Sequence, residues 1–180
     1  MIFSRIIFLL SNKPGFDDLR VAFLRWWGVF LLSLAGCWII YSLDLFSVIW
    51  DADITKLSYA TISLYFIASY SLGIINKNMM FHVAANDGNP TEYIKGKLQV
   101  IAYFSNTMLG LGFLGTLIGF MIMAQAFVHL DTSNAASVQH ALSQMASGIH
   151  TAIITTVVGL ICSMLLNLQL MSFEYGLRKV

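Results

Sequence analysis

The chain has 180 residues, of which 58% are hydrophobic and 11% are charged. Soluble domains carry about a quarter charged residues, so this composition excludes an ordinary soluble fold and indicates an integral membrane protein. The formal net charge of +1 gives no basic surface for nucleic acid.

The N-terminal segment begins MIFSRIIFLL, an apolar run with Arg5 inside it. No small-residue cleavage site follows, so the run does not have the pattern of a signal peptide. We expect a short amphipathic helix at the membrane surface that ends at the turn SNKPG. Residues 1–23 are therefore interpreted as a cytoplasmic or interfacial segment, and residues 24–180 as a transmembrane domain.

Four stretches are apolar enough to cross a hydrocarbon core, which takes about 20 helical residues. The predicted spans are residues 26–43, 58–76, 98–130 and 145–171. The third span is long enough that part of it is expected to project beyond the bilayer. The inner connection over residues 77–97 is short and contains the turn signal NDGNP, so it leaves no room for a separate domain.

The basic residues predict the orientation. If both termini are inside, the single basic residue in an outer loop is Lys56. The inner segments then hold the other nine, namely Arg5, Lys13, Arg20, Arg25, Lys77, Lys95, Lys97, Arg178 and Lys179. This bias predicts that both termini are cytoplasmic.

The third and fourth spans each carry a stripe of small and hydroxylated residues. Spacings of three and four place such residues on one helix face, where they permit close helix crossing. The third span contributes Gly112, Gly115, Thr116 and Gly119, and the fourth contributes Gly148, Ala152, Thr155, Thr156, Gly159 and Ser163. Each hydroxyl has a plainer interpretation, since a threonine in a membrane helix often donates to the carbonyl one turn back.

These two spans are also the place of a family resemblance. LGFLGTLIGFMIMAQAF followed by MASGIHTAIITTVVGL is similar to the paired helix signature of the MotA/TolQ/ExbB proton-channel family. The resemblance covers residues 109–167. The four predicted spans match the MotA branch, whereas the helix signatures are closer to the TolQ/ExbB branch. The resemblance implies that the third and fourth spans line the centre of a homopentamer in the bacterial inner membrane.

The same resemblance implies a partner and a pathway. Two copies of a single-span protein of the MotB/ExbD/TolR type would stand inside the pentamer, and each would bring a membrane Asp that is protonated and deprotonated as ions cross. The family's pore threonines correspond to Thr116 and Thr156, with Thr155 as their neighbour. The glycines at 112, 115, 119, 148 and 159 are expected to pack the helices. No cofactor or metal is implied.

Two positions depart from the family pattern. Thr151 stands where TolQ-like and ExbB-like chains carry a Glu, and Leu165 stands where they carry a Pro. Without the Glu, a proton route that uses a carboxylate of this subunit is in question. Without the Pro, the fourth helix is predicted to be straighter. The short inner connection argues against a flagellar stator, whose relatives have a large cytoplasmic region there.

Other residues leave alternatives open. His150, near the outer end of the fourth span, could touch the ion entrance or sense pH, or it could be an interfacial hydrogen-bonded histidine. His129 with Asp131 could attract cations at the outer mouth. A small membrane enzyme or haem protein using His129, His140 and His150 is one alternative, although no enzyme motif is present. The other is a membrane scaffold whose small-residue stripes only pack helices. Threonine hydroxyls suit protons and sodium ions alike.

Overall fold

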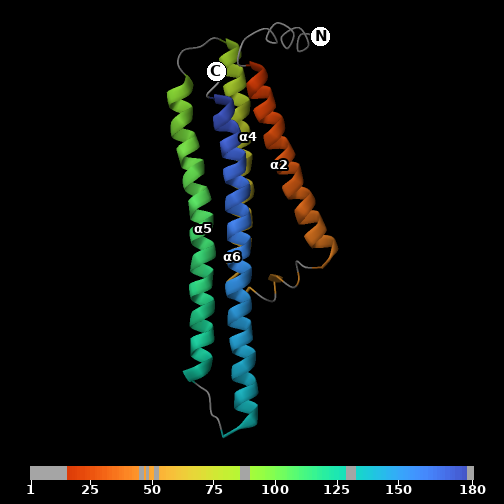
Figure 1. Cartoon of the computed structure of the whole chain (residues 1–180), viewed down its shortest axis with the longest axis vertical. Coiled ribbons are helices and arrows are strands. Elements are labelled where there is room, and N and C mark those ends of the chain that lie inside the picture. Colours follow the sequence, from red (N-terminus) through yellow and green to blue (C-terminus); the bar gives the residue numbers. More distant parts are fainter. Residues whose placement is uncertain are drawn as a thin grey trace. The chain divides into compact units, whose positions relative to one another are not determined.

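The computed structural model describes residues 16–44, 47, 49–50, 53–85, 90–128 and 133–177. The described residues form four long helices (Figure 1): α2 (Phe16–Ser42), α4 (Leu57–Ala85), α5 (Pro90–Val128) and α6 (Ala135–Leu177). All four are long and apolar enough to cross a membrane. The prediction of an all-helical chain with four such helices is confirmed. Residues 1–15, His129 and Asp131 lie outside the described residues.

Helices α5 and α6 are much longer than a bilayer core requires. They have 39 and 43 residues, which correspond to lengths of about 58 and 64 Å against a hydrocarbon thickness of about 30 Å. Helix also covers most of the inner connection expected over residues 77–97, because α4 continues to Ala85 and α5 begins at Pro90. Parts of both long helices must therefore lie outside the hydrocarbon.

The helix ends have local causes. Proline at the first position of α5 has its φ angle already suited to a helix and lacks only an amide that would have no partner there. Asn134 precedes α6 and its side-chain oxygen accepts from the Ala136 amide at 3.0 Å, as an N-cap does. Helix α2 is followed by Asp44 in the left-handed region, with φ of 54°, which turns the chain away from the helix axis.

The chain divides into two compact units, each containing parts of all four helices. The first comprises residues 1–36, 66–104 and 165–180, and the second comprises residues 37–65 and 105–164.

In the first unit the indole of Trp26 joins α2 to α4. Its Nε1 donates to the carbonyl of Ser69 at 3.1 Å, and its ring lies against Gly73, where no side chain larger than hydrogen would fit. The Ser69 hydroxyl in turn donates to Oε1 of the buried Gln169 on α6 at 2.8 Å. Because unpaired polar groups are costly inside a membrane protein, this chain of hydrogen bonds fixes the register of three helices.

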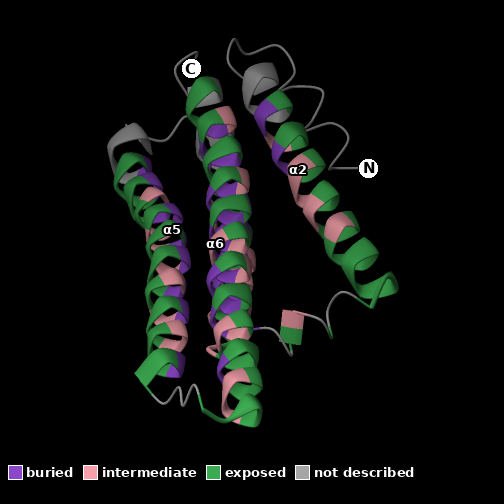
Figure 2. Cartoon of the chain, turned by 60° about the horizontal axis from the view of Figure 1, so that its bottom comes forward, coloured by how far each residue is buried: buried purple, intermediate pink, exposed green. Residues whose placement is uncertain are grey.

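Most of α2 from Val21 onward is exposed, and Figure 2 colours the exposed residues of its ribbon green and the half-buried ones pink. Phe23 and Phe30 stack on either side of the buried Trp26, with ring centroids 5.6 and 5.4 Å away. Toward its C-terminal end α2 presents large apolar side chains such as Trp38, which is 72% exposed. Such a helix surface suits lipid or a neighbouring chain.

In the second unit the start of α4 is capped by Asp53. This buried carboxylate accepts from the amides of Thr55 and Ser58 at 3.1 and 2.9 Å and from the Thr55 hydroxyl at 2.7 Å. Next to it the Lys56 ammonium lies 3.0 Å from the centre of the Trp50 ring. Burial acts to raise the pKa of the Asp53 carboxyl, but the hydrogen bonds from Ser58 and Thr55 outweigh it and hold the pKa below its usual range.

We expect Asp53→Asn to destabilise the detergent-solubilised protein at neutral pH by up to about 1 kcal/mol, because Asn caps a helix as well as Asp does and only the attraction of the carboxylate charge to the helix N-terminus is lost. A pKa that is lower in the folded than in the unfolded state stabilises the fold above the unfolded value, about 3.9, and this contribution is lost as pH falls through the folded value. The difference between Asp53→Asn and wild type in thermal unfolding should therefore vanish in acid.

Asp44→Asn is the matched control, because Asp44 is exposed and Asn tolerates its positive φ equally well. A loss of stability that is equal for the two variants, or that persists unchanged at acid pH, would contradict the capping role of the Asp53 carboxylate.

Candidate functional site

Helices α5 and α6 cross closely in the second unit through pairs of glycines. A Cβ built at Gly119 would lie 2.5 Å from the carbonyl oxygen of Gly148, and one at Gly159 would lie 2.9 Å from the Cα of Gly112. These neighbours are backbone atoms, which cannot swing aside as a side chain can. Further along the same antiparallel pair, the hydroxyls of Ser105 and Ser163 lie 3.1 Å apart. We call this line of contacts the glycine seam.

Thr155 lies inside the glycine seam. Its side chain is 1% exposed and fills the space in front of Gly115, where a Cβ would overlap it. The hydroxyl donates to the carbonyl of Thr151 at 2.9 Å and lies 3.2 Å from that of Ala152. Of the three threonines that the sequence singles out, Thr155 is thus the one held between the two helices.

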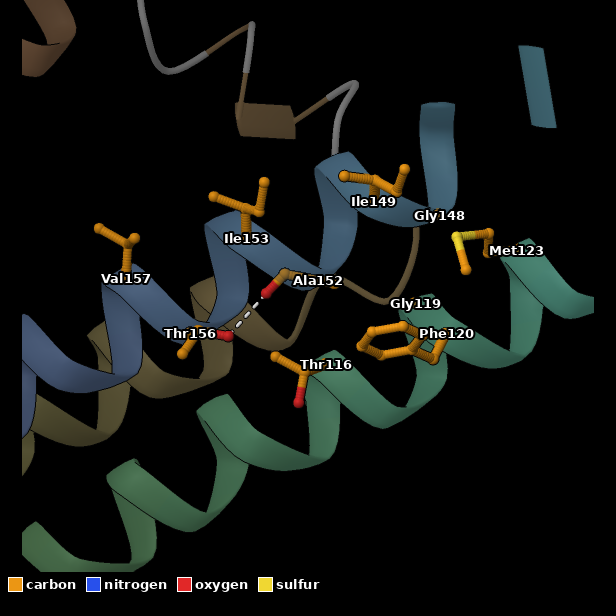
Figure 3. A pocket seen from close by; sticks show the side chains of 10 residues that line it. All are labelled: Thr116, Gly119, Phe120, Met123, Gly148, Ile149, Ala152, Ile153, Thr156 and Val157. Atoms are coloured by element: carbon orange, nitrogen blue, oxygen red, sulfur yellow. Dashed lines mark hydrogen bonds between the residues drawn. The ribbon is translucent and has the colours of Figure 1, made fainter. Parts of the chain in front are cut away.

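Thr116 and Thr156 line a groove beside the seam, with a volume of about 380 Å³ (Figure 3). The other residues that line it are Gly119, Phe120 and Met123 of α5 and Gly148, Ile149, Ala152, Ile153 and Val157 of α6. The groove is therefore apolar except for two hydroxyls, one from each helix. Gly119 and Gly148 belong to both groove and seam, so close helix crossing and groove shape depend on the same residues.

Both groove hydroxyls are hydrogen-bonded within their own helices. Thr116 donates to the Phe113 carbonyl at 2.5 Å, and Thr156 donates to the Ala152 carbonyl at 2.6 Å. Figure 3 shows the Thr116 hydroxyl turned away from α6. A hydroxyl that has donated its one proton keeps lone pairs that accept. In this state the two hydroxyls add almost nothing to the accessible surface of the groove, which is nearly all apolar.

The groove contains no titratable side chain. Between residues 105 and 128 the described part of α5 has no Asp, Glu, Lys, Arg or His, and between 135 and 164 of α6 the ionisable residues of those types are His140 and His150. Thr151, at the position of the family Glu, is fully buried. Within the described residues no cluster of three His, Cys, Asp or Glu could hold a metal ion. None of the residues that line this groove supplies a carboxylate.

Comparison with known protein families matches residues 79–176, more than half of the chain, to the MotA/TolQ/ExbB proton channel family. The chain belongs to the MotA/TolQ/ExbB family. The matched residues contain the whole of α5 and nearly the whole of α6, so they include the seam and the groove. No curated protein and no solved structure matched the chain.

Membership of the MotA/TolQ/ExbB family, together with four apolar helices, makes this a multi-pass membrane protein with an ion-channel role in a motor-like complex. The family is a transport family rather than an enzyme class, and its members work with partners of the MotB/ExbD/TolR type.

Sequence reasoning grouped Thr155 with Thr156 but did not separate their environments. Adjacent residues on a helix are turned by about 100°, so the two side chains cannot share one surface. The residue that distinguishes Thr155 from Thr156 is Gly115 of α5. It has no side chain, and the Thr155 side chain occupies the space that one would fill. Phe120, Met123 and Ile153 were not expected to line a site. Large apolar residues occur on every face of a membrane helix, so the sequence does not indicate which of them face lipid and which face another helix.

We predict that Gly119→Ala will weaken the α5–α6 pair, because the new Cβ would meet backbone and the Ala152 Cβ at 2.7 Å. Overpacking of this kind costs about 1–3 kcal/mol. Thermal unfolding in detergent should show a lower Tm. Gly110→Ala on the same helix is the control, because its Cβ would meet nothing within 4 Å. Equal Tm values for the two variants would contradict the close crossing at Gly119.

Proposed function

We propose that this chain is the channel subunit of an ion-driven rotary motor, in which five copies surround two copies of a single-span partner. Helices α5 and α6 line the centre of the pentamer and turn their groove toward the partner. The observation that carries this proposal is the groove itself, since it brings Thr116 and Thr156 together on a surface with no ionisable group of its own.

The chemistry of the groove favours a partner that bears a membrane Asp. A carboxylic acid needs an acceptor for its proton, and each threonine hydroxyl has lone pairs for this purpose once its oxygen turns toward the groove, whose surface is otherwise apolar. Ionised Asp needs donors, which become available if a hydroxyl rotates away from its carbonyl. The groove can thus hold both protonation states of the partner's Asp without a fixed charge that would trap either one.

The energy source is the ion gradient across the bacterial inner membrane. With nine of ten basic residues on one side, the positive-inside bias supports cytoplasmic termini. Each proton that crosses releases about 2.3 kcal/mol per 100 mV. That energy turns the pentamer about the partner. The short connection between α4 and α5 favours an output through the partner or a separate protein rather than through a flagellar rotor.

The first test is the composition of the purified complex. After co-expression with a single-span, Asp-bearing partner, native mass spectrometry of the detergent-solubilised complex should give five copies of this chain and two of the partner. A monomer, a dimer or an even-numbered ring without such a partner would overturn the motor.

We also expect Thr156→Val and Thr116→Val to lower proton flux in the reconstituted complex while the complex still assembles. Loss of a hydrogen bond worth about 1.4 kcal/mol corresponds to about a tenfold change in rate. Thr107→Val is the control, because Thr107 lies on α5 outside the residues that line the groove.

A scaffold without ion conduction is the second candidate, and the local hydrogen bonds of all three threonines favour it. If the scaffold is correct, Thr156→Val leaves flux and biological output unchanged and alters only stability. That outcome would remove the groove hydroxyls from any ion path.

A further inference from the structure

One exposed face of the outer part of α6 carries three polar residues and an alanine, while the exposed His140 and Gln144 lie off this face. Gln139, Ser143, Ala146 and His150 follow one another at spacings of four, three and four residues, which places them in one row along the helix. All four are exposed, and the small Ala146 leaves room beside Ser143 and His150. We call these four residues the polar row.

The polar row faces away from the glycine seam. The opposite side of the same stretch of α6 is buried and includes Ala141 and Gly148. Gly148 is in contact with Gly119 and Met123 of α5. Helix α5 therefore covers the back of this stretch and leaves the polar row open.

The polar row leads directly to the groove. Continuing from His150 by three and then four residues reaches Ile153 and Val157, and both line the groove (Figure 3). Ile149, which directly precedes His150, also lines it. His150 is thus the last polar residue of the row before the groove begins.

This face of α6 is unsuited to lipid at the depth where the row ends. His150 and the half-buried Ser147 fall inside the predicted span 145–171, and polar side chains at membrane depth lie almost always against protein or a water-filled cavity. The exposed face of α5 at this level is apolar, with Leu117, Phe120 and Met121 more than half exposed. At the level of His150 the exposed polar side chain is therefore on α6, and on α5 the exposed Gln125 lies about one turn beyond Met121.

We propose that the polar row is a hydrated access path from the outer side of the membrane to the groove, and that His150 takes up and releases protons at its inner end. The proposal rests on the proposed channel function and adds a site to it. An imidazole nitrogen accepts a proton from a hydronium ion on the outer side, and imidazolium passes that proton to water in the groove. The imidazole is thereby restored, and the proton continues to the carboxylate of the partner.

The surroundings of His150 leave its proton exchange to water. Helix α5 packs against this part of α6 and has no ionisable side chain in its described residues 105–128. On α6 itself the nearest ionisable residue is His140, ten positions away. The remaining ionisable groups described in the same unit are Cys37, Tyr41, Asp44, Asp53, Lys56, Tyr59, Tyr65 and Cys162.

The path is tested first by accessibility, which needs no ion flux. With Cys37 and Cys162 replaced by Ala, Ala146→Cys and Met121→Cys are compared in spheroplasts that contain the full complex, using a membrane-impermeant maleimide. Both positions are exposed in the single chain. They lie at similar depth on the antiparallel pair, because Gly148 contacts both Gly119 and Met123.

We expect Ala146→Cys to react from outside at least tenfold faster than Met121→Cys, since only the α6 position lies on the polar row. Equal rates, or no reaction at Ala146→Cys, would overturn the hydrated path.

The role of His150 is tested by proton flux in proteoliposomes as a function of outer pH between about 5 and 8, the range in which histidine ordinarily changes charge. His150→Gln keeps a polar side chain but cannot titrate. We expect it to lower flux at least threefold and to abolish the pH dependence in this range, whereas the control His140→Gln retains the wild-type profile.

The outcomes separate the two proposals. If the wild-type complex conducts protons and His150→Gln has the same pH profile, the proposal that His150 carries protons is wrong, whereas the proposed channel function is retained. If the wild-type complex carries no protons at all, the channel function is wrong and the role of His150 falls with it.

Discussion

The close crossing of α5 and α6 is the constraint on which the rest of the site depends. Two helices can approach until backbone meets backbone only where side chains are absent, and Gly112, Gly119, Gly148 and Gly159 meet this condition on both sides of the contact. Apolar side chains gain little from burial when the alternative is lipid, so the attraction in such a pair comes from dispersion and from hydrogen bonds like that of Ser105 with Ser163. A methyl group added at one of these four glycines would push the helices apart, and this would weaken both the dispersion attraction and the hydrogen bonds between them.

The seam also determines what each helix presents outside it. Once Thr155 is fixed in front of Gly115, the helical rotation of about 100° per residue turns Thr156 into the groove. The same rotation leaves His150 and the rest of the polar row on an exposed face. One packing contact thus orients both the groove and the polar row, so a rotation of α6 would move the two surfaces together.

The sequence predicted the four apolar helices because a membrane core imposes a length and a polarity that are easily read. It did not predict where the helices end. Lys77, Lys95 and Lys97 lie on exposed helical turns. A charged residue is as compatible with such a turn as with a loop, so these lysines did not indicate that the helices continue. It identified Thr116 and Thr156, but it could not distinguish Thr156 from Thr155, because that distinction depends on which residue of a different helix leaves a gap. The family match confirms the resemblance and leaves the roles of single residues to experiment.

The direction of the two groove hydroxyls has a consequence for the sign of the charge that can pass. Thr116 and Thr156 donate their protons to carbonyls of their own helices, so what remains available is oxygen lone pairs, the negative ends of the hydroxyl dipoles. A chloride ion would find no hydroxyl donor in this groove unless a helix hydrogen bond broke first, and a cation would have to draw the hydroxyl oxygens to a surface that is nearly all apolar. In the proposed channel, a preference for cations would rest on these oxygens rather than on charged residues, and it would persist at high salt, where selectivity based on surface charge is screened.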